Sequence, residues 1–127
     1  MAKWITMGAA AVDTIVKVPR LPKADEIVYP ISIEQHPGGS TANIAVGLSR
    51  LGETVSFFGK AGDDANGKVI VDSFHADGVD TANLKIEAGN SSGGAFIAVD
   101  EEGERVIYSL GGNTLYETWS EINPAAF

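Results

Sequence analysis

The 127-residue chain has no cysteine, no long apolar run and few basic side chains. Without cysteine, neither a disulfide scaffold nor a thiolate metal site can form. No stretch approaches the ~20 uninterrupted apolar residues that a membrane-spanning helix requires. We therefore expect a cytoplasmic protein with no membrane partner.

Basic residues are outnumbered, nine Lys and Arg against seventeen Asp and Glu, which gives a formal net charge of −8. The basic residues are scattered, whereas nucleic-acid binders carry a basic patch. No grouping of His and carboxylate residues along the sequence suggests a protein metal site. We expect neither a nucleic-acid partner nor a metal ligand set, and the length fits a single domain.

The first seventeen residues are mostly apolar and raise the question of a signal peptide. Asp13 interrupts the apolar run and Lys17 follows it, so a buried strand and a turn explain the segment better. The strand is expected at residues 4–7, and Asp13 follows a turn of small residues.

Strands and helices are expected to alternate through the middle of the chain. One helix should start after Gly39, with Ser40 or Thr41 as its cap, and end before Gly52. A second should open at Gly62-Asp63-Asp64 and end at Gly78. Short strands are expected at residues 55–58 and 84–86. This order predicts an α/β fold with a parallel sheet built from βαβ units.

Four extended segments do not fit this alternation. Residues 14–18 and 26–33 read as extended arms, and Pro30 indicates an edge or a bulge in the second. Residues 93–99 and 105–110 flank a polar turn that contains glycine, so they read as a hairpin. We expect these segments to form a small separate sheet.

The last thirteen residues are expected to start a helix and to restart one at Asn123-Pro124, a favourable helix opening. Only three residues follow Pro124. The chain is therefore interpreted as part of a longer protein, and Trp119 and Phe127 are expected to be exposed where a further part would pack.

The most informative stretch runs from Gly38 to Gly62 and reads GGSTANIAVGLSRLGETVSFFGKAG. Two glycines let the backbone approach a ligand closely, and the following helix start offers free N–H donors. Asn43 adds both a donor and an acceptor. These groups suit a polyhydroxylated ligand. Spacing alone equally allows Gly38-Gly39 to be a simple turn and Asn43 a local cap.

The stretch resembles the N-terminal signature of the ribokinase-like (PfkB) family of carbohydrate kinases. The matching pieces, in order, are Met7-Gly8, Asp13, Gly38-Gly39, Asn43, Gly52, Gly59, Gly62-Asp63-Asp64, Gly67, Gly78-Val79 and Gly111-Gly112-Asn113. The resemblance covers essentially all 127 residues. It implies that residues 1–127 are the N-terminal portion of a ribokinase-like domain, a partial Rossmann-like parallel sheet with flanking helices and a small β-sheet lid.

The resemblance also implies site residues. Asp13 and Asn43 would contact sugar hydroxyls, and Gly38 and Gly39 would give backbone access. Residues 14–18, 26–33, 93–99 and 105–110 would form the lid, which closes over the sugar and pairs two subunits in a homodimer. The alternative for Asp13 is a structural cap or turn residue, and Asp63 and Asp64 are interpreted as helix caps.

The implied activity is transfer of the ATP γ-phosphate to a hydroxyl of a sugar or nucleoside, with Mg²⁺. The family's catalytic Gly-Ala-Gly-Asp motif does not occur in the chain, so no catalytic residue is assigned and the isolated chain is expected to be inactive. The alternative is a non-catalytic sugar-binding or dimerisation module. A dinucleotide site is disfavoured, because Gly8-Ala9-Ala10-Ala11 lacks the G-x-G-x-x-G spacing.

Overall fold

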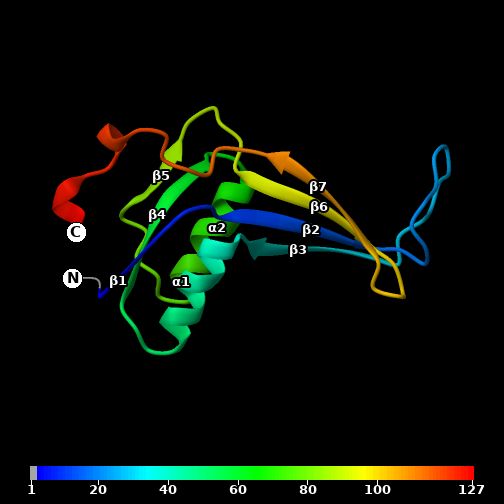
Figure 1. Cartoon of the computed structure of the whole chain (residues 1–127), viewed down its shortest axis with the longest axis horizontal. Coiled ribbons are helices and arrows are strands. Elements are labelled where there is room, and N and C mark those ends of the chain that lie inside the picture. The colour runs from blue at the N-terminus through cyan, green and yellow to red at the C-terminus, as the bar shows by residue number, and fades with distance from the viewer. Residues whose placement is uncertain (1–2) are drawn as a thin grey trace.

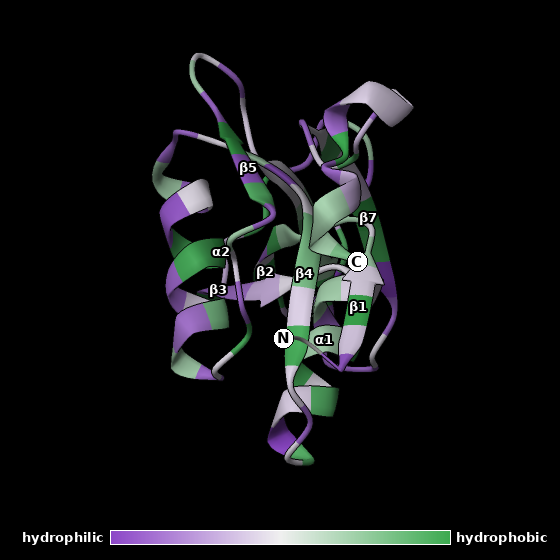
Figure 2. Ribbon diagram, turned by 90° about the vertical axis from the view of Figure 1, so that its left-hand side faces the viewer, coloured by the Kyte–Doolittle hydropathy of each residue, from purple (hydrophilic) through white to green (hydrophobic). Residues whose placement is uncertain are grey.

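A computed structural model describes residues 3–127 (Figure 1). Its centre is a three-stranded parallel sheet in the order β1-β4-β5, made of β1 (Trp4–Met7), β4 (Val55–Gly62) and β5 (Leu84–Glu87). Strand β4 lies between the other two (Figure 2). Helices α1 (Ser40–Arg50) and α2 (Ala65–Ala76) connect the strands in sequence. The expected α/β architecture is confirmed.

A second, four-stranded sheet extends away from the helices (Figure 1). We call it the mixed sheet, because its order β3-β2-β6-β7 combines one parallel and two antiparallel pairs. The strands are β2 (Ala11–Lys17), β3 (Ser32–Gly38), β6 (Gly93–Val99) and β7 (Arg105–Gly111). The predicted hairpin is confirmed as β6 and β7, which pair in antiparallel register.

The prediction for the second arm was wrong. The strand runs from Ser32 to Gly38 instead of 26–33, and residues 26–31 lie outside the strands. Strand β3 pairs along the whole length of β2. The ends of β3 are therefore set by its pairing with β2 and not by the apolar residues of the second arm. Pro37 is tolerated because β3 is an edge strand. The first arm also begins earlier than predicted, at Ala11, and ends at Lys17.

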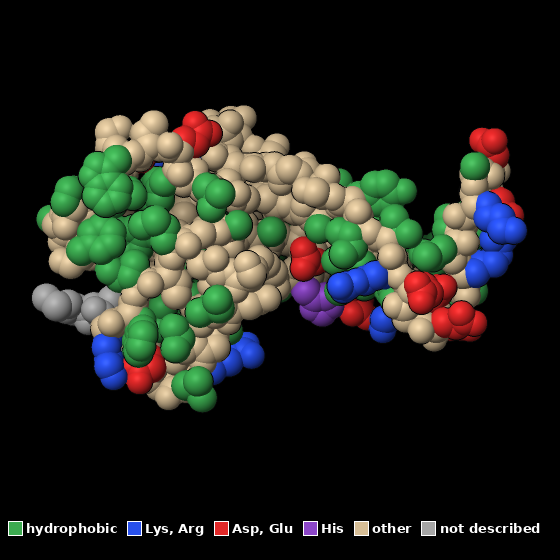
Figure 3. Space-filling model, in the orientation of Figure 1, with side chains coloured by type: hydrophobic (Ala, Val, Ile, Leu, Met, Phe, Trp, Pro, Cys, Tyr) green, Lys and Arg blue, Asp and Glu red, His purple; other side chains and the backbone are tan. Residues whose placement is uncertain are grey.

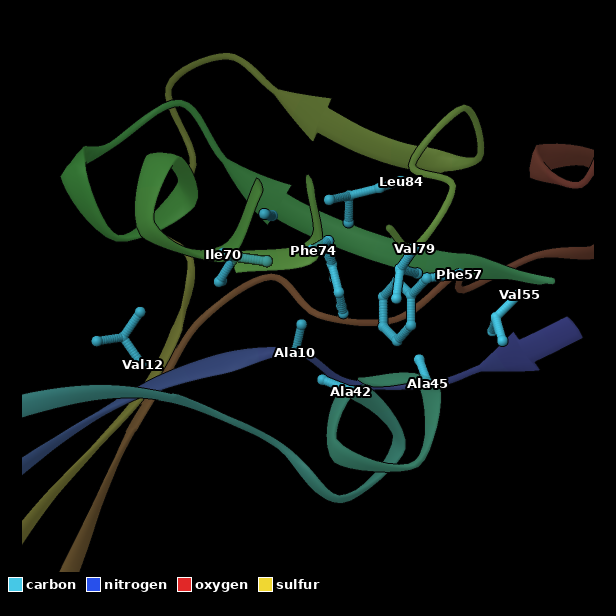
Figure 4. Packing of buried hydrophobic residues seen from close by; sticks show 11 residues of the cluster. Ala10, Val12, Ala42, Ala45, Val55, Phe57, Ile70, Phe74, Val79 and Leu84 are labelled. Atoms are coloured by element: carbon cyan, nitrogen blue, oxygen red, sulfur yellow. The ribbon is translucent and has the colours of Figure 1, made fainter. Parts of the chain in front are cut away.

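Both helices cover the same face of the parallel sheet. Alternate residues of β4 point to one face, and Val55 and Phe57 pack there in a cluster with side chains of both helices (Figure 4). The rings of Phe57 and Phe74 of α2 lie 4.6 Å apart between centroids. The small side chains Ala42 and Ala45 bring α1 close to the sheet, and both are buried.

The opposite face of β4 is covered by the C-terminal segment. The ring of Phe58 is buried and lies 5.4 Å from the ring of Phe127. The segment forms only two short 3₁₀ helices, η1 (Trp119–Glu121) and η2 (Pro124–Ala126). The expected cap at the second is present, since the Asn123 side chain accepts a hydrogen bond from the Ala125 N–H at 3.1 Å.

Apolar side chains gather at the end of the molecule that carries the C-terminal segment (Figure 3). Trp119 is 76% exposed and Phe127 is 61% exposed, as the sequence predicted. No helix within residues 3–127 is both long and apolar enough to cross a bilayer.

Candidate functional site

Asp13 lies inside strand β2 and not in a turn, next to the Gly38-Gly39 pair. In the β2–β3 ladder, Ala11 lies opposite Gly38 and Asp13 opposite His36. Residues two apart share a face of a strand, so Asp13 lies on the same face as Ala11 and its partner Gly38. A side chain at position 38 would therefore point to the same side as that of Asp13. A Cβ at Gly38 would lie 2.9 Å from Asp13 Cγ and would collide with the carboxylate. Glycine at this position leaves the space that the carboxylate occupies.

Gly39 forms the junction between β3 and α1. Its φ of 97° is in the left-handed region, and a Cβ here would lie 2.6 Å from the carbonyl oxygen of Ala9. Only glycine adopts this geometry without strain. The helix N-cap is Gly39 itself and no side chain caps it, so the expected capping by Ser40 or Thr41 was wrong. The first N–H groups of α1 therefore remain without a side-chain partner next to Asp13.

Asn43 is exposed on the first turn of α1. It lines a cavity of about 200 Å³ between α1 and α2, to which Gly38 also contributes. Asp13 is not among the residues that line this cavity. Gly38 is thus the residue that the two groups share: it contacts the Asp13 carboxylate on one side and borders the Asn43 cavity on the other.

An ion pair contributes to the lining of this cavity. Arg50 donates two hydrogen bonds to the Asp77 carboxylate, at 2.7 and 3.1 Å. The Arg50 guanidinium lowers the pKa of Asp77. Because the guanidinium is already paired, it adds little positive potential for an anionic ligand.

The strand beside Asp13 carries a second polar pair. His36 and Glu34 of β3 share the face of Asp13, and His36 Nε2 lies 3.0 Å from Glu34 Oε2. The hydrogen bond with His36 lowers the pKa of Glu34. The groups around Asp13 are therefore carboxylates, an imidazole and backbone amides, which suits a neutral ligand rich in hydroxyls better than an anion.

The Gly62-Asp63-Asp64 motif has a structural role. Asp64 caps α2, as the sequence predicted, and accepts a hydrogen bond from the Gly67 N–H at 2.8 Å. The same carboxylate accepts from the Ser92 N–H at 2.9 Å and the Ser92 hydroxyl at 2.6 Å. Asp63 is not the cap and accepts instead from the Gly89 N–H at 3.0 Å. Sequence reasoning missed Ser92, which no local motif distinguishes.

A buried lysine was also missed. The Lys60 side chain, on β4, is only 4% exposed and forms ion pairs with Glu87, at 3.3 Å, and with Glu121 of the C-terminal segment. The hydrogen bond with Glu121 raises the pKa of Lys60, and the same bond lowers the pKa of Glu121 to about 2. Because Glu121 belongs to the C-terminal segment, its ion pair with Lys60 links this segment to the sheet.

Within residues 3–127, no group of three or more His, Asp or Glu side chains is arranged to hold a metal ion.

Known proteins resemble this chain in sequence and in fold. A family model described as pfkB family carbohydrate kinase matches residues 1–127. Bacillus subtilis ribokinase is 36% identical over 125 residues, which are 98% of this chain and 41% of that protein. A Clostridium botulinum 5-dehydro-2-deoxygluconokinase is 45% identical over 84 residues, 64% of this chain and 25% of that protein.

Among solved structures, Arabidopsis thaliana ribokinase complexed with ribose and ATP superposes with a TM-score of 0.80 at 27% identity. The match covers 88% of this chain and 36% of that one. The chain spans less than half the length of each of these relatives. The resemblance inferred from the motifs is confirmed over the full sequence: the chain belongs to the pfkB family of carbohydrate kinases.

Proposed function

We propose that the chain is the sugar-binding portion of an ATP-dependent kinase that transfers the γ-phosphate to a hydroxyl of a sugar or nucleoside. One observation carries the proposal. The Asp13 carboxylate lies against the glycine pair that leads into the uncapped start of α1. In this proposal the carboxylate is the acceptor and the N–H groups at the start of α1 are the donors for the hydroxyls of one bound sugar.

Each site residue has a distinct part in this proposal. Asp13 accepts hydrogen bonds from two hydroxyls, and such charge-assisted bonds contribute about 1.5–3 kcal/mol each. The N–H groups that follow Gly39 donate to sugar oxygens, and Asn43 both donates and accepts. Gly38 keeps the space beside the carboxylate open. Ribose bound by the A. thaliana relative is a ligand of this chemical type.

The mixed sheet acts as the lid in this proposal. It carries Asp13 on β2 and extends beyond the helices, so its movement toward α1 would enclose a bound sugar. Enclosure excludes water, which would otherwise compete with the sugar hydroxyl for the phosphoryl group.

Phosphoryl transfer itself needs groups beyond this chain. A general base for the sugar hydroxyl, donors for the transferring phosphate and the ATP site with its Mg²⁺ are assigned to further residues of a longer protein, because the chain spans 41% of the B. subtilis ribokinase. The contribution of this portion is to bind and orient the acceptor hydroxyl and to exclude water.

The mixed sheet also offers a surface for a homodimer. Four exposed apolar side chains share the face opposite Asp13 by strand register: Ile33, Phe96, Val106 and Tyr108. The rings of Phe96 and Tyr108 lie 6.2 Å apart between centroids. Sedimentation of a Phe96→Ser/Tyr108→Ser variant tests this, with Ile107→Ser, an exposed change on the Asp13 face, as the control. A monomeric parent chain would leave this part of the proposal without support.

Titration of the ¹⁵N-labelled chain with D-ribose and D-fructose, followed by amide shifts, tests the sugar site. We expect saturable shifts in the amides of residues 39–43 and in β2 for one sugar, and their loss in Asp13→Ala. Equal shifts in the parent chain and in Asp13→Ala would contradict the site. If the chain dimerises but binds neither sugar, the alternative of a non-catalytic dimerisation module is favoured.

A further inference from the structure

The mixed sheet joins the body of the protein through a buried serine. Ser92, which immediately precedes β6, is 6% exposed. Its hydroxyl donates to Asp64 Oδ1 at 2.6 Å and accepts from the Gly62 N–H at 2.9 Å, while its N–H donates to Asp64 Oδ2 at 2.9 Å. Ser92 and Asp64 are 28 residues apart in sequence, so these bonds connect the root of the sheet to the start of α2.

The backbone segments around this root pack closely against one another. A Cβ at Gly112, where β7 returns to the body, would lie 2.6 Å from the Gly93 nitrogen. A Cβ at Gly62 would lie 2.6 Å from the carbonyl carbon of Asn90, and one at Gly67 would collide with the Gly62 carbonyl oxygen. The glycines of the motif therefore let the end of β4, the start of α2 and the root of the hairpin meet at one point.

Strand β6, which starts at this root, is paired directly with the strand that carries Asp13. Strand β6 pairs with β2 in parallel register, with Gly93 opposite Ala11 and Ala95 opposite Asp13. The start of α1 packs on the parallel sheet through the buried Ala42 and Ala45, and Gly39 joins it to β3 of the mixed sheet. The position at which Ser92 fixes β6 therefore contributes, together with β3, to the position of Asp13 relative to the N–H donors of α1.

We propose that Asp64 is a positioning residue for the sugar site, which fixes the mixed sheet through Ser92 and so sets Asp13 opposite the start of α1. This rests on the proposed function of Asp13 as a sugar ligand. Capping of α2 is a second task of the same carboxylate, and the two tasks use separable bonds. The bond from Gly67 serves the cap, and the two bonds from Ser92 serve the sheet.

Two substitutions separate the tasks. Asp64→Ser keeps a good N-cap that can accept from Gly67, but its side chain is too short to reach Ser92 as well. Ser92→Ala keeps the Asp64 cap and removes the hydroxyl bonds. Asp63→Ser is the matched control, because Asp63 is next to Asp64 in sequence but accepts a hydrogen bond from the Gly89 N–H. Asp64→Asn, which keeps one acceptor oxygen, is a milder change if either variant folds poorly.

The assay is backbone amide exchange on the ¹⁵N-labelled chain, with the β2–β6 ladder compared against α2 and β4. We expect Asp64→Ser and Ser92→Ala to lower protection in the ladder by roughly 10- to 100-fold, the effect of losing a hydrogen bond to a charged group. Protection in α2 and β4 should change by less than about threefold. The double variant should lose less protection than the sum of the two single losses, because both substitutions remove the bond between the Ser92 hydroxyl and Asp64.

D-ribose titration gives the second readout. Both variants should weaken ribose binding by a similar factor of roughly ten or more, and Asp63→Ser should leave it unchanged. An equal loss of protection in α2, β4 and the ladder would reduce Asp64 to a general structural residue and overturn the proposal, as would unchanged ribose affinity with a loosened ladder. If the parent chain binds neither D-ribose nor D-fructose, the proposed function fails, and with it the sugar-site role, whereas the exchange data still decide whether Asp64 fixes the mixed sheet.

Discussion

The substitution Gly38→Ala tests the candidate site with a single methyl group. The added Cβ would lie 2.9 Å from Asp13 Cγ and 3.3 Å from Oδ1, with the other carboxylate oxygen closer still. The backbone of Gly38 is not in the left-handed region, so alanine can adopt it. The carboxylate, as the end of a flexible side chain, must therefore turn away while the fold is retained.

The expected magnitudes for stability and binding differ. Stability should change by less than about 1 kcal/mol, because the lower entropy of the unfolded alanine chain offsets part of the displacement of Asp13. Sugar affinity should fall by roughly 10- to 100-fold, since at least one charge-assisted hydrogen bond of about 1.5–3 kcal/mol is lost. Asp13→Ala should show the same loss, and the double variant no further loss.

Urea unfolding and D-ribose titration by amide shifts measure the two quantities. Gly47→Ala is the control, because a Cβ at this α1 position meets nothing within 4 Å and should stabilise the helix by about 1 kcal/mol without affecting the sugar. Ribose affinity of Gly38→Ala equal to that of Gly47→Ala would refute the assignment of Asp13 to the site.

Three further outcomes are expected. Gly39→Ala should destabilise the chain by more than Gly38→Ala, about 1–3 kcal/mol in urea unfolding, because it imposes a φ of 97° on alanine and meets the Ala9 backbone; equal stabilities would contradict this. Ile70→Val should cost about 0.5–1.5 kcal/mol, since Ile70 is 2% exposed in the core, and no change in the unfolding midpoint would place it elsewhere. Lowering the pH from about 4.5 to 2 should destabilise the chain, because the pKa of Glu121 is about 2 in the folded chain and ordinarily 4.5. The stabilisation by Glu121 is complete above this range and is lost as the folded chain takes up the proton. Thermal melts of Glu121→Gln should show a shallower decline over that range, and parallel declines would argue against the Lys60–Glu121 pair.

Local signals predicted much of the architecture. Glycines at 52 and 78 end both helices with positive φ, and Asp64 caps the second helix, as their residue types indicated. The hairpin at residues 93–110 was predicted because a polar turn separates two β-prone runs. In each case the residues that decide the structure lie within a few positions of one another, so the sequence carries the signal directly.

The second arm shows where local reasoning fails. The apolar residues of 26–33 resemble a strand, yet the strand occupies 32–38, which includes His36 and Pro37. Pairing with β2 supplies the hydrogen bonds there, and an edge strand tolerates proline. Pairing with β3 likewise places Asp13 inside strand β2, whereas the sequence predicted a residue that follows a turn.

By itself, the sequence determined the fold class and the helix ends, because caps, turns and glycine spacing act over short distances. Its resemblance to the pfkB family supplied Asp13, Gly38, Gly39 and Asn43 as site candidates. Only the tertiary structure decided that Asp13 faces Gly38, that Asp64 bonds to Ser92, and that Lys60 is buried against Glu121. These contacts join residues 25 to 61 positions apart. Such partners are chosen by strand register and by the need to pair every buried charge, and neither is visible until the chain has folded.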